Sequence, residues 1–269
     1  MALSPNMNVM LRAAEKASRS LIRDFGEVEQ LQVSLKGPGD FVSAADMRAE
    51  KIIFEELQKA RPTFGFLMEE QGEVKGTDGE HRWIIDPLDG TTNFLHGIPH
   101  WAISIALEYR GEVIAGIVYD PIKDEMFRAE KGTGAFTKNK RLRVSGRKDL
   151  PLSVIAGGGP SLNRHNQATY INQLQSLLKS VAGFRRFGAA SLDMAYVAAG
   201  RYEAYWEEDL KAWDVAAGAL IVKEAGGYVG TLDGKGDPIY DGDILASNMT
   251  VIEAVRKILA TAAKETAAA

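Results

Sequence analysis

An apolar strand that runs directly into an acidic turn constrains this chain more than any other feature. Trp83-Ile84-Ile85 has the aromatic and β-branched character of a buried strand, and Asp86-Pro87-Leu88-Asp89-Gly90 follows it without a break. The proline favours an extended conformation of the residue before it, and the glycine allows the chain to reverse. Both aspartates can therefore face the end of the strand, and Thr91-Thr92-Asn93-Phe94 is typical of a short helix that begins there.

This turn has the chemistry of half a metal site. Two close carboxylates such as those of Asp86 and Asp89 repel each other unless a cation lies between them. Oxygen ligands of this kind suit Mg²⁺ or Mn²⁺ better than a soft metal, and the helix start would turn N–H groups toward a phosphate. The alternative is an ordinary turn in which both aspartates accept only local N–H groups. The segment alone does not decide between the two.

Composition excludes several classes of protein. The chain has 269 residues, 45% of them hydrophobic, which is ordinary for a globular protein with a sizeable core. The absence of cysteine excludes disulfides and thiolate sites, and the four histidines lack the spacing of a zinc hydrolase. A net charge of −4 argues against direct nucleic-acid binding. Without a signal-peptide pattern or an apolar run of roughly 18 residues, we expect a cytoplasmic protein that does not enter a membrane.

The spacing of apolar residues changes near residue 148. Before that point it predicts a helix over 8–25, a polar link around 37–40 and a second helix, which begins near Ser43 and has Asp46 in its first turn. Six strand-like runs follow, at 64–68, 82–85, 102–109, 113–119, 126–127 and 135–136. We therefore predict a subdomain over about 1–148 in which a helix pair covers a largely antiparallel sheet.

The second half predicts alternating strands and helices. The strands are expected at 154–156, 184–187, 202–206, 228–229 and 244–246, and the helices at 163–178, 192–199, 213–224 and from 251 to a fraying end after 261. This pattern indicates a second α/β subdomain over about 149–269. No repeat or long linker interrupts the chain, so residues 1–269 are expected to form a single unit.

Two further segments have weaker signals. Gly157-Gly158-Gly159-Pro160 matches neither a dinucleotide-binding motif nor a P-loop, and we interpret it as an ordinary flexible loop. The basic segments Arg185-Arg186 and Lys138–Arg143 could contact a protein partner, although solvated faces are the commoner role of such runs.

Two other acidic positions can complete the site. Glu69 and Glu70 follow the predicted strand 64–68, so one of them can project from the same sheet edge as Asp86. Asp214 opens the predicted helix 213–224, where it could also act only as a helix cap. Each position alone favours the structural role, and the three motifs together favour a site.

The combination resembles the inositol monophosphatase family of Mg²⁺-dependent, Li⁺-sensitive phosphatases, over about residues 13–254. The motifs that carry the resemblance are Glu69-Glu70, the stretch from Asp86 to Phe94, Trp213-Asp214-Val215-Ala216-Ala217-Gly218 and Glu224-Ala225-Gly226-Gly227. The stretch from Leu192 to Arg201 is similar to the bacterial branch called extragenic suppressor proteins. The resemblance implies the α/β (α+β) class and a layered αβαβα sandwich of the sugar-phosphatase type.

The resemblance also implies the reaction. The expected activity is Mg²⁺-dependent hydrolysis of a phosphomonoester, above all inositol 1-phosphate, by water that the metal activates. Two or three Mg²⁺ ions are expected, with Mn²⁺ as a substitute and Li⁺ as an inhibitor. Relatives that act on fructose 1,6-bisphosphate, histidinol phosphate or 3′-phosphoadenosine phosphates are alternatives. The implied partners are a small phosphate ester, a second copy in a homodimer and, as an alternative role, the transcription machinery.

The residues of the site follow from the resemblance position by position. It implies that Glu69, Asp86 and the Leu88 carbonyl hold one ion, and that Asp86, Asp89 and Asp214 hold another. Glu69, Thr91 and Asp46 would orient the attacking water. The implied substrate contacts are Lys36, Gly90, Thr91, Gly188, Ala189, Ala190, Glu207 and Asp214.

Three positions depart from the usual family pattern. Met68 stands where Gly often precedes the paired glutamates, which leaves open whether Glu69 or Glu70 is the ligand. Ala189 replaces a frequent Ser or Thr, so that only backbone contacts remain there. Asp209 stands where Gly is common and adds negative charge beside the predicted pocket. These departures concern the choice of substrate more than the reaction.

Overall fold

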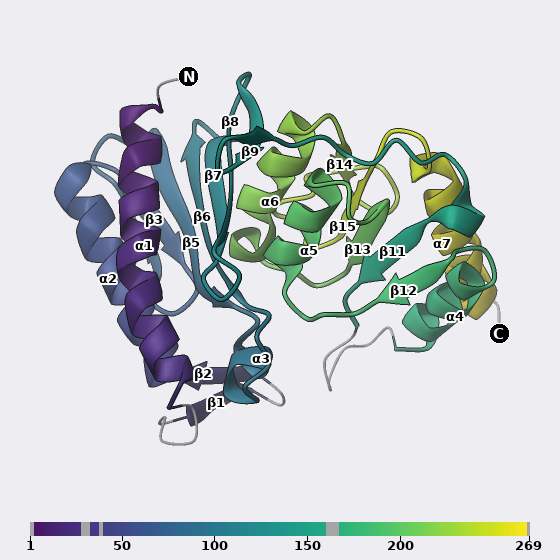
Figure 1. Cartoon of the computed structure of the whole chain (residues 1–269), viewed down its shortest axis with the longest axis horizontal. Helices are drawn as coiled ribbons and strands as arrows, with labels where there is room; N and C mark the ends of the chain where they lie inside the picture. The colour runs from purple at the N-terminus through teal and green to yellow at the C-terminus, as the bar shows by residue number, and fades with distance from the viewer. Residues whose placement is uncertain (1–2, 28–32, 38–39, 160–166, 268–269) are drawn as a thin grey trace.

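The helices and sheets form five layers (Figure 1). The computed structural model describes residues 3–27, 33–37, 40–159 and 167–267, and only the backbone of 33–37 and 40–43. One helix pair covers the outer face of an eight-stranded sheet, a second pair lies between this sheet and a five-stranded one, and a third covers the far side. In this order the helices are α1 (Pro5–Phe25) and α2 (Ala44–Ala60), α5 (Ala190–Ala198) and α6 (Ala212–Glu224), α4 (Gln167–Leu178) and α7 (Ile252–Ala267). The expected α/β class and αβαβα layering are confirmed.

The first helix begins earlier than its apolar spacing predicted. Ser4 caps α1, because its hydroxyl oxygen accepts a hydrogen bond from the N–H of Met7 at 3.1 Å, and Pro5 occupies the first helical turn. Proline is favoured there because the N–H that it lacks has no partner inside the helix. One face of α1 is buried against α2 and the sheet, including Met10, Ala14 and Leu21 at 0% exposure.

The eight-stranded sheet has the order β10-β9-β8-β7-β6-β5-β3-β4. Its strands are β3 (Gly65–Met68), β4 (Gly72–Val74), β5 (His81–Asp89), β6 (Ala102–Tyr109), β7 (Glu112–Asp120), β8 (Glu125–Glu130), β9 (Gly134–Thr137) and β10 (Lys140–Arg141). Every pair of neighbours is antiparallel except β3 and β5, which run parallel with Met68 opposite Ile85. The next residues, Glu69 and Asp86, therefore lie beside each other at the same end of the two strands.

Small residues allow α6 to pack closely against both of its neighbours. A methyl group on Gly116 of β7 would lie 3.0 Å from Cα of Ala217, and one on Gly218 would lie 2.8 Å from Cβ of Met194 on α5. Residues 215–222 of α6 are all buried, as expected of a helix between two sheets. The small residues at 216–218 of α6 therefore allow the beginning of this helix to lie close to the eight-stranded sheet.

The five-stranded sheet has the order β12-β11-β13-β15-β14. Its strands are β11 (Val154–Gly157), β12 (Gly183–Arg185), β13 (Ala204–Glu207), β14 (Tyr228–Gly230) and β15 (Ile244–Ser247). Strand β11 runs parallel to β12 and β13, whereas β15 is antiparallel to β13 and β14. The sequence predicted these five strands within a few residues, but the beginning of the predicted helix 163–178 lies outside the described residues.

The predicted polar link around 37–40 proved wrong in part. Its described residues belong to two paired strands, β1 (Val33–Gly37) and β2 (Asp40–Ser43), and residues 38–39 lie outside the described part of the chain. The sequence did not indicate these strands, because both runs are too short for their alternation to do so. The proposed division of the chain near residue 148 stays a prediction.

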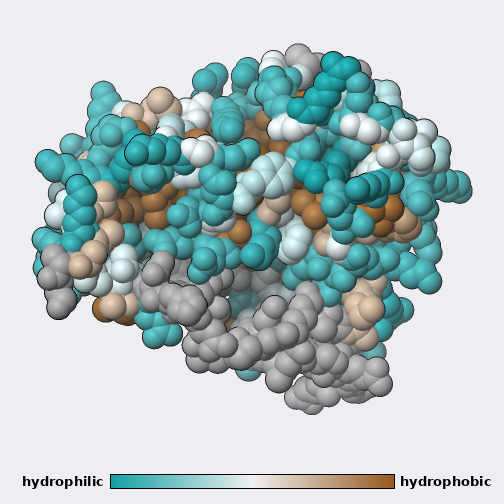
Figure 2. Space-filling model, turned by 180° about the vertical axis from the view of Figure 1, so that it is seen from behind, coloured by the Kyte–Doolittle hydropathy of each residue, from teal (hydrophilic) through white to brown (hydrophobic). Residues whose placement is uncertain are grey.

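The surface on the reverse side is mostly hydrophilic (Figure 2). Hydrophobic residues come to the surface there only in separate patches between hydrophilic ones. The largest fully buried side chains, among them Trp83, Trp101 and Trp206, lie in the layers between helices and sheets. Among the described residues no helix is long and apolar enough to cross a membrane.

Candidate functional site

The acidic motif forms the end of β5 and contains an irregularity in the sheet. Asp86 lies opposite Ser104 of β6, but Asp89 lies opposite Ala102, so β5 has one extra residue between these pairs. Such a bulge bends the strand and redirects its side chains. Gly90 follows with a φ of 94°, a conformation that favours glycine, and starts the one-turn helix α3 (Thr91–Leu95). The predicted strand, turn and short helix are all present.

Asp86 occupies the centre of the acidic group. Its carboxylate accepts a hydrogen bond from the N–H of Leu88 at 2.9 Å, and its side chain is only 2% exposed. Burial, together with the nearby charges of Glu69, Asp89 and Asp214, raises the pKa of Asp86 well above that of an ordinary aspartate. A hydrogen bond between Asp86 and Glu69 adds to this shift. The four predicted carboxylates therefore lie close enough to repel one another.

Glu69, and not Glu70, is the glutamate beside Asp86. The parallel pairing of β3 with β5 places Glu69 there, and its N–H donates to the carbonyl of Ile85 at 3.2 Å. Glu70 instead lines a cavity of about 510 Å³ next to α2, together with Met47 and Phe54. The geometry thus favours Glu69 among the two alternatives that the sequence left open.

Asp89 connects the motif to α5. Its carboxylate accepts hydrogen bonds from the backbone N–H groups of Ala190 at 3.2 Å and Ser191 at 2.8 Å, and from the Ser191 hydroxyl. These are the first N–H groups of α5, which have no partner inside the helix. Burial raises the pKa of Asp89 to about 6, and the hydrogen bonds from Ser191 and Ala190 limit the rise.

Asp214 is both a helix cap and a member of the acidic group. It lies in the first turn of α6, where its carboxylate accepts the N–H of Lys211 at 2.6 Å. Ser104, opposite Asp86, donates its hydroxyl to the carbonyl of Trp213 at 3.2 Å and holds this end of α6 beside β5. Burial is the main cause that raises the pKa of Asp214, and the charges of Asp89 and Glu69 contribute.

Helix α2 contacts the site through two buried acidic residues one turn apart. The Thr91 hydroxyl lies 3.2 Å from an oxygen of Asp46 and 3.1 Å from the Leu88 carbonyl. Glu50 accepts the backbone N–H groups of Glu70 at 2.8 Å and Gln71 at 3.0 Å. Asp46 and Glu50 lie on the same face of α2, which is therefore hydrogen-bonded both to Thr91 and to the turn after Glu69.

The predicted substrate segment lies directly against the acidic motif. A methyl group on Gly90 would lie 3.3 Å from both the Gly188 carbonyl oxygen and Cβ of Ala189. Asn93 joins the two segments, because its side-chain amide donates to the carbonyls of His100 at 2.8 Å and Phe187 at 2.6 Å. Gly188 is exposed, whereas Ala189 and Ala190 are buried.

Glu207 ends β13 and is partly exposed. One of its carboxylate oxygens accepts a hydrogen bond from the buried Tyr205 hydroxyl at 2.5 Å. The charge of Glu207 also helps to raise the pKa of Asp214, which places it on the same side of the site. Lys36 lies on β1, and its side chain is outside the described part of the chain.

The oxygen donors of the acidic group are chemically suited to a hard divalent cation. Among the described residues no group of three or more acidic or histidine side chains already has the spacing of a closed metal site. The oxygens of Asp86, Asp89 and Asp214 face backbone N–H groups instead. Four carboxylates without a histidine or cysteine are nevertheless the ligand type that Mg²⁺ prefers. The raised pKa values of Asp86, Asp89 and Asp214 indicate a site that favours positive charge.

Sequence reasoning missed several residues that support the site. They are Glu50, Asn93, Ser104, Ser191 and Tyr205, and each makes a hydrogen bond to a residue distant in the sequence or to a predicted site residue. The position of Ser191 in the first turn of a helix was the only local signal.

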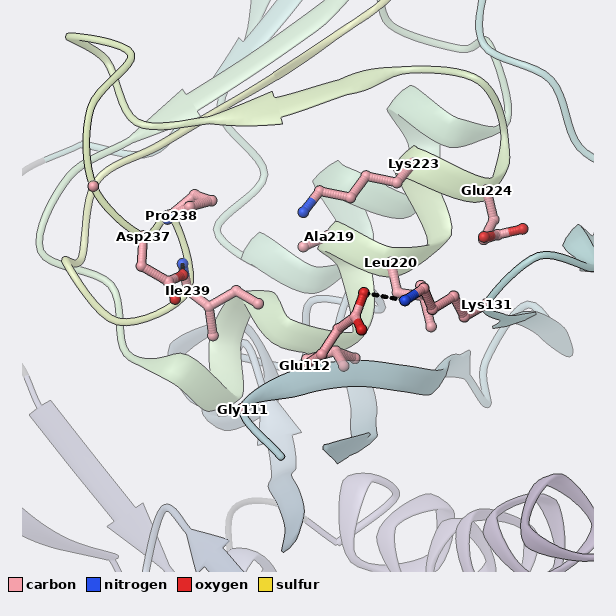
Figure 3. A pocket seen from close by; sticks show the side chains of 12 residues that line it. Gly111, Glu112, Lys131, Ala219, Leu220, Lys223, Glu224, Asp237, Pro238 and Ile239 are labelled. Atoms are coloured by element: carbon pink, nitrogen blue, oxygen red, sulfur yellow. Dashed lines mark hydrogen bonds and ion pairs between the residues drawn. The ribbon is translucent and has the colours of Figure 1, made fainter. Parts of the chain in front are cut away.

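A cavity of about 410 Å³ lies elsewhere, between the C-terminal end of α6, the β6–β7 turn and residues 236–239 (Figure 3). Lys131 pairs there with Glu112, and the Glu224 carboxylate accepts the N–H groups of Gly132 and Gly134, both at 2.7 Å. None of the predicted site residues lines this cavity.

Comparison of the sequence with known proteins gives a family and several similar proteins. The model of the inositol monophosphatase family matches residues 3–267. An inositol-1-monophosphatase of Rhizobium meliloti (strain 1021) is 56% identical over 259 residues, which are 96% of this chain and 97% of that protein. The Nus factor SuhB of Pseudomonas aeruginosa PAO1 is 44% identical over 257 residues, or 94% of this chain and 95% of that protein.

Solved structures agree with these relatives. The extragenic suppressor protein suhB from Bartonella henselae has a TM-score of 0.93 and 55% identity, and the match covers 95% of this chain and 98% of that one. An IMPase/NADP phosphatase complexed with Mg²⁺ and phosphate has a TM-score of 0.79 and 25% identity, with 91% and 90% covered.

The fold and these relatives define an enzyme of the phosphatase class. This chain belongs to the inositol monophosphatase family. The resemblance that the sequence motifs indicated, and the prediction of an enzyme, are confirmed.

Proposed function

We propose that this protein hydrolyses a phosphomonoester in a Mg²⁺-dependent reaction, and that inositol 1-phosphate is the best candidate substrate. The observation that carries the proposal is the convergence of Glu69, which follows β3, Asp86 and Asp89 on β5, and Asp214 on α6. The proposed substrate follows the name of the relative that is 56% identical, and the metal follows the related phosphatase that was solved with Mg²⁺ and phosphate.

The proposed ligands divide between two cations. Glu69, Asp86 and the Leu88 carbonyl would hold one, and Asp86, Asp89 and Asp214 would hold the other, so that Asp86 bridges them. When bound, Mg²⁺ would supply a lowered pKa for a water molecule and charge stabilisation for the phosphate ester. The carboxylates would balance this charge, and two of the residues, Asp86 and Asp89, are buried. Mn²⁺ could take the same positions.

Thr91 and its contacts would direct the attacking water. In the proposed reaction the Thr91 hydroxyl donates to Asp46, 3.2 Å away, and its oxygen accepts a hydrogen bond from the water. Glu69, which shares a hydrogen bond with Asp86, is the group that would take up the water proton. Phosphoryl transfer depends mostly on such positioning and on charge neutralisation, so no phosphoenzyme is needed.

The alcohol part of the substrate would lie beside residues 188–190 and Glu207, next to the phosphate position at Gly90 and Thr91. Backbone groups of Gly90 and Thr91 would contact the phosphate, with Lys36 as the nearby cation. Gly188, Ala189 and Ala190 would contact the alcohol through their backbone, and Glu207 would accept hydrogen bonds from its hydroxyls. Gly90 already lies against Gly188 and Ala189, so one small ester could reach both segments.

Phosphate release with and without Mg²⁺ tests this proposal. The substrates are inositol 1-phosphate, glycerol 2-phosphate, fructose 1,6-bisphosphate, histidinol phosphate and a 3′-phosphonucleotide. We expect inositol 1-phosphate to give the highest kcat/KM, and Asp86→Asn and Asp214→Asn each to lower turnover by more than about 100-fold. Glu55→Gln on the exposed face of α2 is the control and should retain activity. Wild-type turnover in both aspartate variants would refute the assignment.

Lithium provides a second test of the same metal positions. Li⁺ would compete for a site that these carboxylates form, so tens of millimolar Li⁺ should inhibit phosphate release. Inhibition that more Mg²⁺ relieves supports competition for one of the two positions. Unchanged activity would indicate a different arrangement of ligands.

A second role, in binding the transcription machinery, has one specific observation in its favour. The relative from Pseudomonas aeruginosa carries the name Nus factor. Pull-down from a bacterial extract with the wild type and Asp86→Asn separates the two roles, because binding that survives loss of turnover is independent of catalysis.

We propose the cytoplasm as the location and a homodimer as the assembly. Light scattering of the purified protein tests the dimer.

A further inference from the structure

Each of the three glycines at the end of β11 leaves room for one large side chain. A methyl group on Gly157 would lie 2.9 Å from the ring of Trp206, and one on Gly159 would lie 2.7 Å from Nε of Arg186. The closest approach is at Gly158, where a methyl group would lie 1.7 Å from Cδ of Glu207 and 1.9 Å from one of its oxygens. The Glu207 carboxylate therefore rests directly on the backbone of Gly158.

Hydrogen bonding fixes the relative position of these two residues. Strands β11 and β13 are parallel neighbours, with Gly157 opposite Trp206. The N–H of Gly158 extends this pairing by donating to the Trp206 carbonyl at 3.2 Å. The predicted flexible loop is therefore wrong at its beginning, because Gly157 ends β11 and Gly158 is hydrogen-bonded to β13.

Tyr205 holds the same carboxylate from another direction. Its ring is buried at 0% exposure, and its hydroxyl donates to Glu207 at 2.5 Å. Tyr205 and Glu207 are two residues apart on one strand, so their side chains leave the same face of the sheet. A carboxylate with a strong donor beside it and a flat backbone beneath it has few other orientations available.

We propose that Gly158 and Tyr205 are specificity-determining positioning residues, which hold the Glu207 carboxylate where it accepts hydrogen bonds from the hydroxyls of a polyol phosphate. This inference rests on the proposed function, in which Glu207 contacts the alcohol half of the substrate. A phosphate ester without hydroxyl groups makes no such contact, and its hydrolysis is independent of both residues.

Substitutions at both positions test the inference through substrate preference. Gly158→Ala adds a methyl group that the flexible end of Glu207 must avoid, and Tyr205→Phe removes the hydrogen bond. We expect each variant to lower kcat/KM for inositol 1-phosphate about 10-fold or more, the usual effect of losing a hydrogen bond to a charged group. For p-nitrophenyl phosphate, kcat/KM should change less than about twofold.

Two matched controls separate positioning from general damage. Gly146→Ala adds a methyl group where no atom lies within 4 Å, and Tyr119→Phe removes a hydroxyl that lies 3.4 Å from the exposed Asp124. Both should keep the wild-type ratio between the two substrates. A crystal structure of Gly158→Ala should show the Glu207 carboxyl group displaced from residue 158, with the strands unchanged.

The outcomes distinguish this inference from the proposed function. If the wild type hydrolyses both esters with Mg²⁺ but Gly158→Ala and Tyr205→Phe lose both activities equally, or lose neither, the specificity role is wrong while the phosphatase proposal stands. If the wild type hydrolyses neither ester, both are overturned. A selective loss with inositol 1-phosphate supports the inference.

Discussion

Asp86→Asn should make the protein more stable when divalent cations are removed, although it should strongly lower the proposed activity. The carboxylate of Asp86 is buried beside three others, so its charged form is unfavourable in the folded protein without a cation. Asparagine suits the position, because its oxygen can accept the Leu88 N–H and its amide can donate to Glu69. The variant therefore retains the hydrogen bonds and removes one charge.

The neighbouring Asp89 gives the scale of the effect. Its pKa of about 6 lies about two units above the ordinary value of 3.8, and each unit corresponds to about 1.4 kcal/mol. For Asp89 this corresponds to about 3 kcal/mol at neutral pH, and removal of the Asp86 charge should raise the free energy of unfolding in the same direction. For a protein of this size, about 3 kcal/mol corresponds to a rise in Tm of roughly 6 to 12 °C.

The pH dependence follows from the direction of the shift. A raised pKa means that the folded state binds more protons than the unfolded state above pH 3.8, so stability is full below that pH and falls as pH rises through the folded pKa. The advantage of Asp86→Asn should therefore be largest at neutral pH and disappear near pH 4.

Thermal unfolding in EDTA and in excess Mg²⁺ measures the difference in stability between Asp86→Asn and the wild type. Added Mg²⁺ should raise the Tm of the wild type, by an amount equivalent to about 2.7 kcal/mol at 100 times the dissociation constant, and should affect the variant much less. The reasoning is refuted if EDTA-treated Asp86→Asn is less stable than the wild type at pH 7.5, or if its advantage is the same at pH 4.

Three other substitutions test the surroundings of the site. Glu50→Gln leaves one acceptor oxygen for the N–H groups of Glu70 and Gln71. Half of the maximal phosphatase activity should then need about 10-fold more Mg²⁺. Glu55→Gln is the control and should not change this Mg²⁺ requirement. Asp193→Asn should raise Tm by a few degrees at neutral pH and not at pH 4. Burial and the charge of Glu207 raise the pKa of Asp193, so the contribution of this residue to stability falls as pH rises. A pH profile of Tm that is the same in variant and wild type would contradict this. Gly116→Val overlaps Ala217 and should cost about 1 to 3 kcal/mol in urea unfolding, whereas unchanged stability would show that α6 can move away from the sheet.

Local sequence patterns predicted most of the elements because each pattern lies within one element. The run from Asp86 to Phe94 specified a strand end, a turn and a helix from its own proline, glycine and apolar residues. The predicted strand 82–85 was too short, because β5 continues through a bulge to Asp89. A bulge depends on which residues of β6 lie opposite, and no single strand contains that information.

The supporting residues of the site could not be found in this way. Glu50 contacts a turn about 20 residues later in the chain, and Ser191 contacts Asp89 from 102 residues away. The glycines at 157–159 looked like a loop because the side chains that need their space come from β13 and from Arg186. Each of these contacts depends on the packing of two elements, which residue types and spacing within one segment do not reveal.

The bond between Asp89 and the start of α5 has a mechanical consequence. One carboxylate satisfies the first N–H groups of a helix in the central layer and belongs to the proposed cation group. The orientation of the Asp89 carboxylate is therefore tied to the position of α5, and a substitution that displaces the first turn of this helix should also displace one of the proposed ligands.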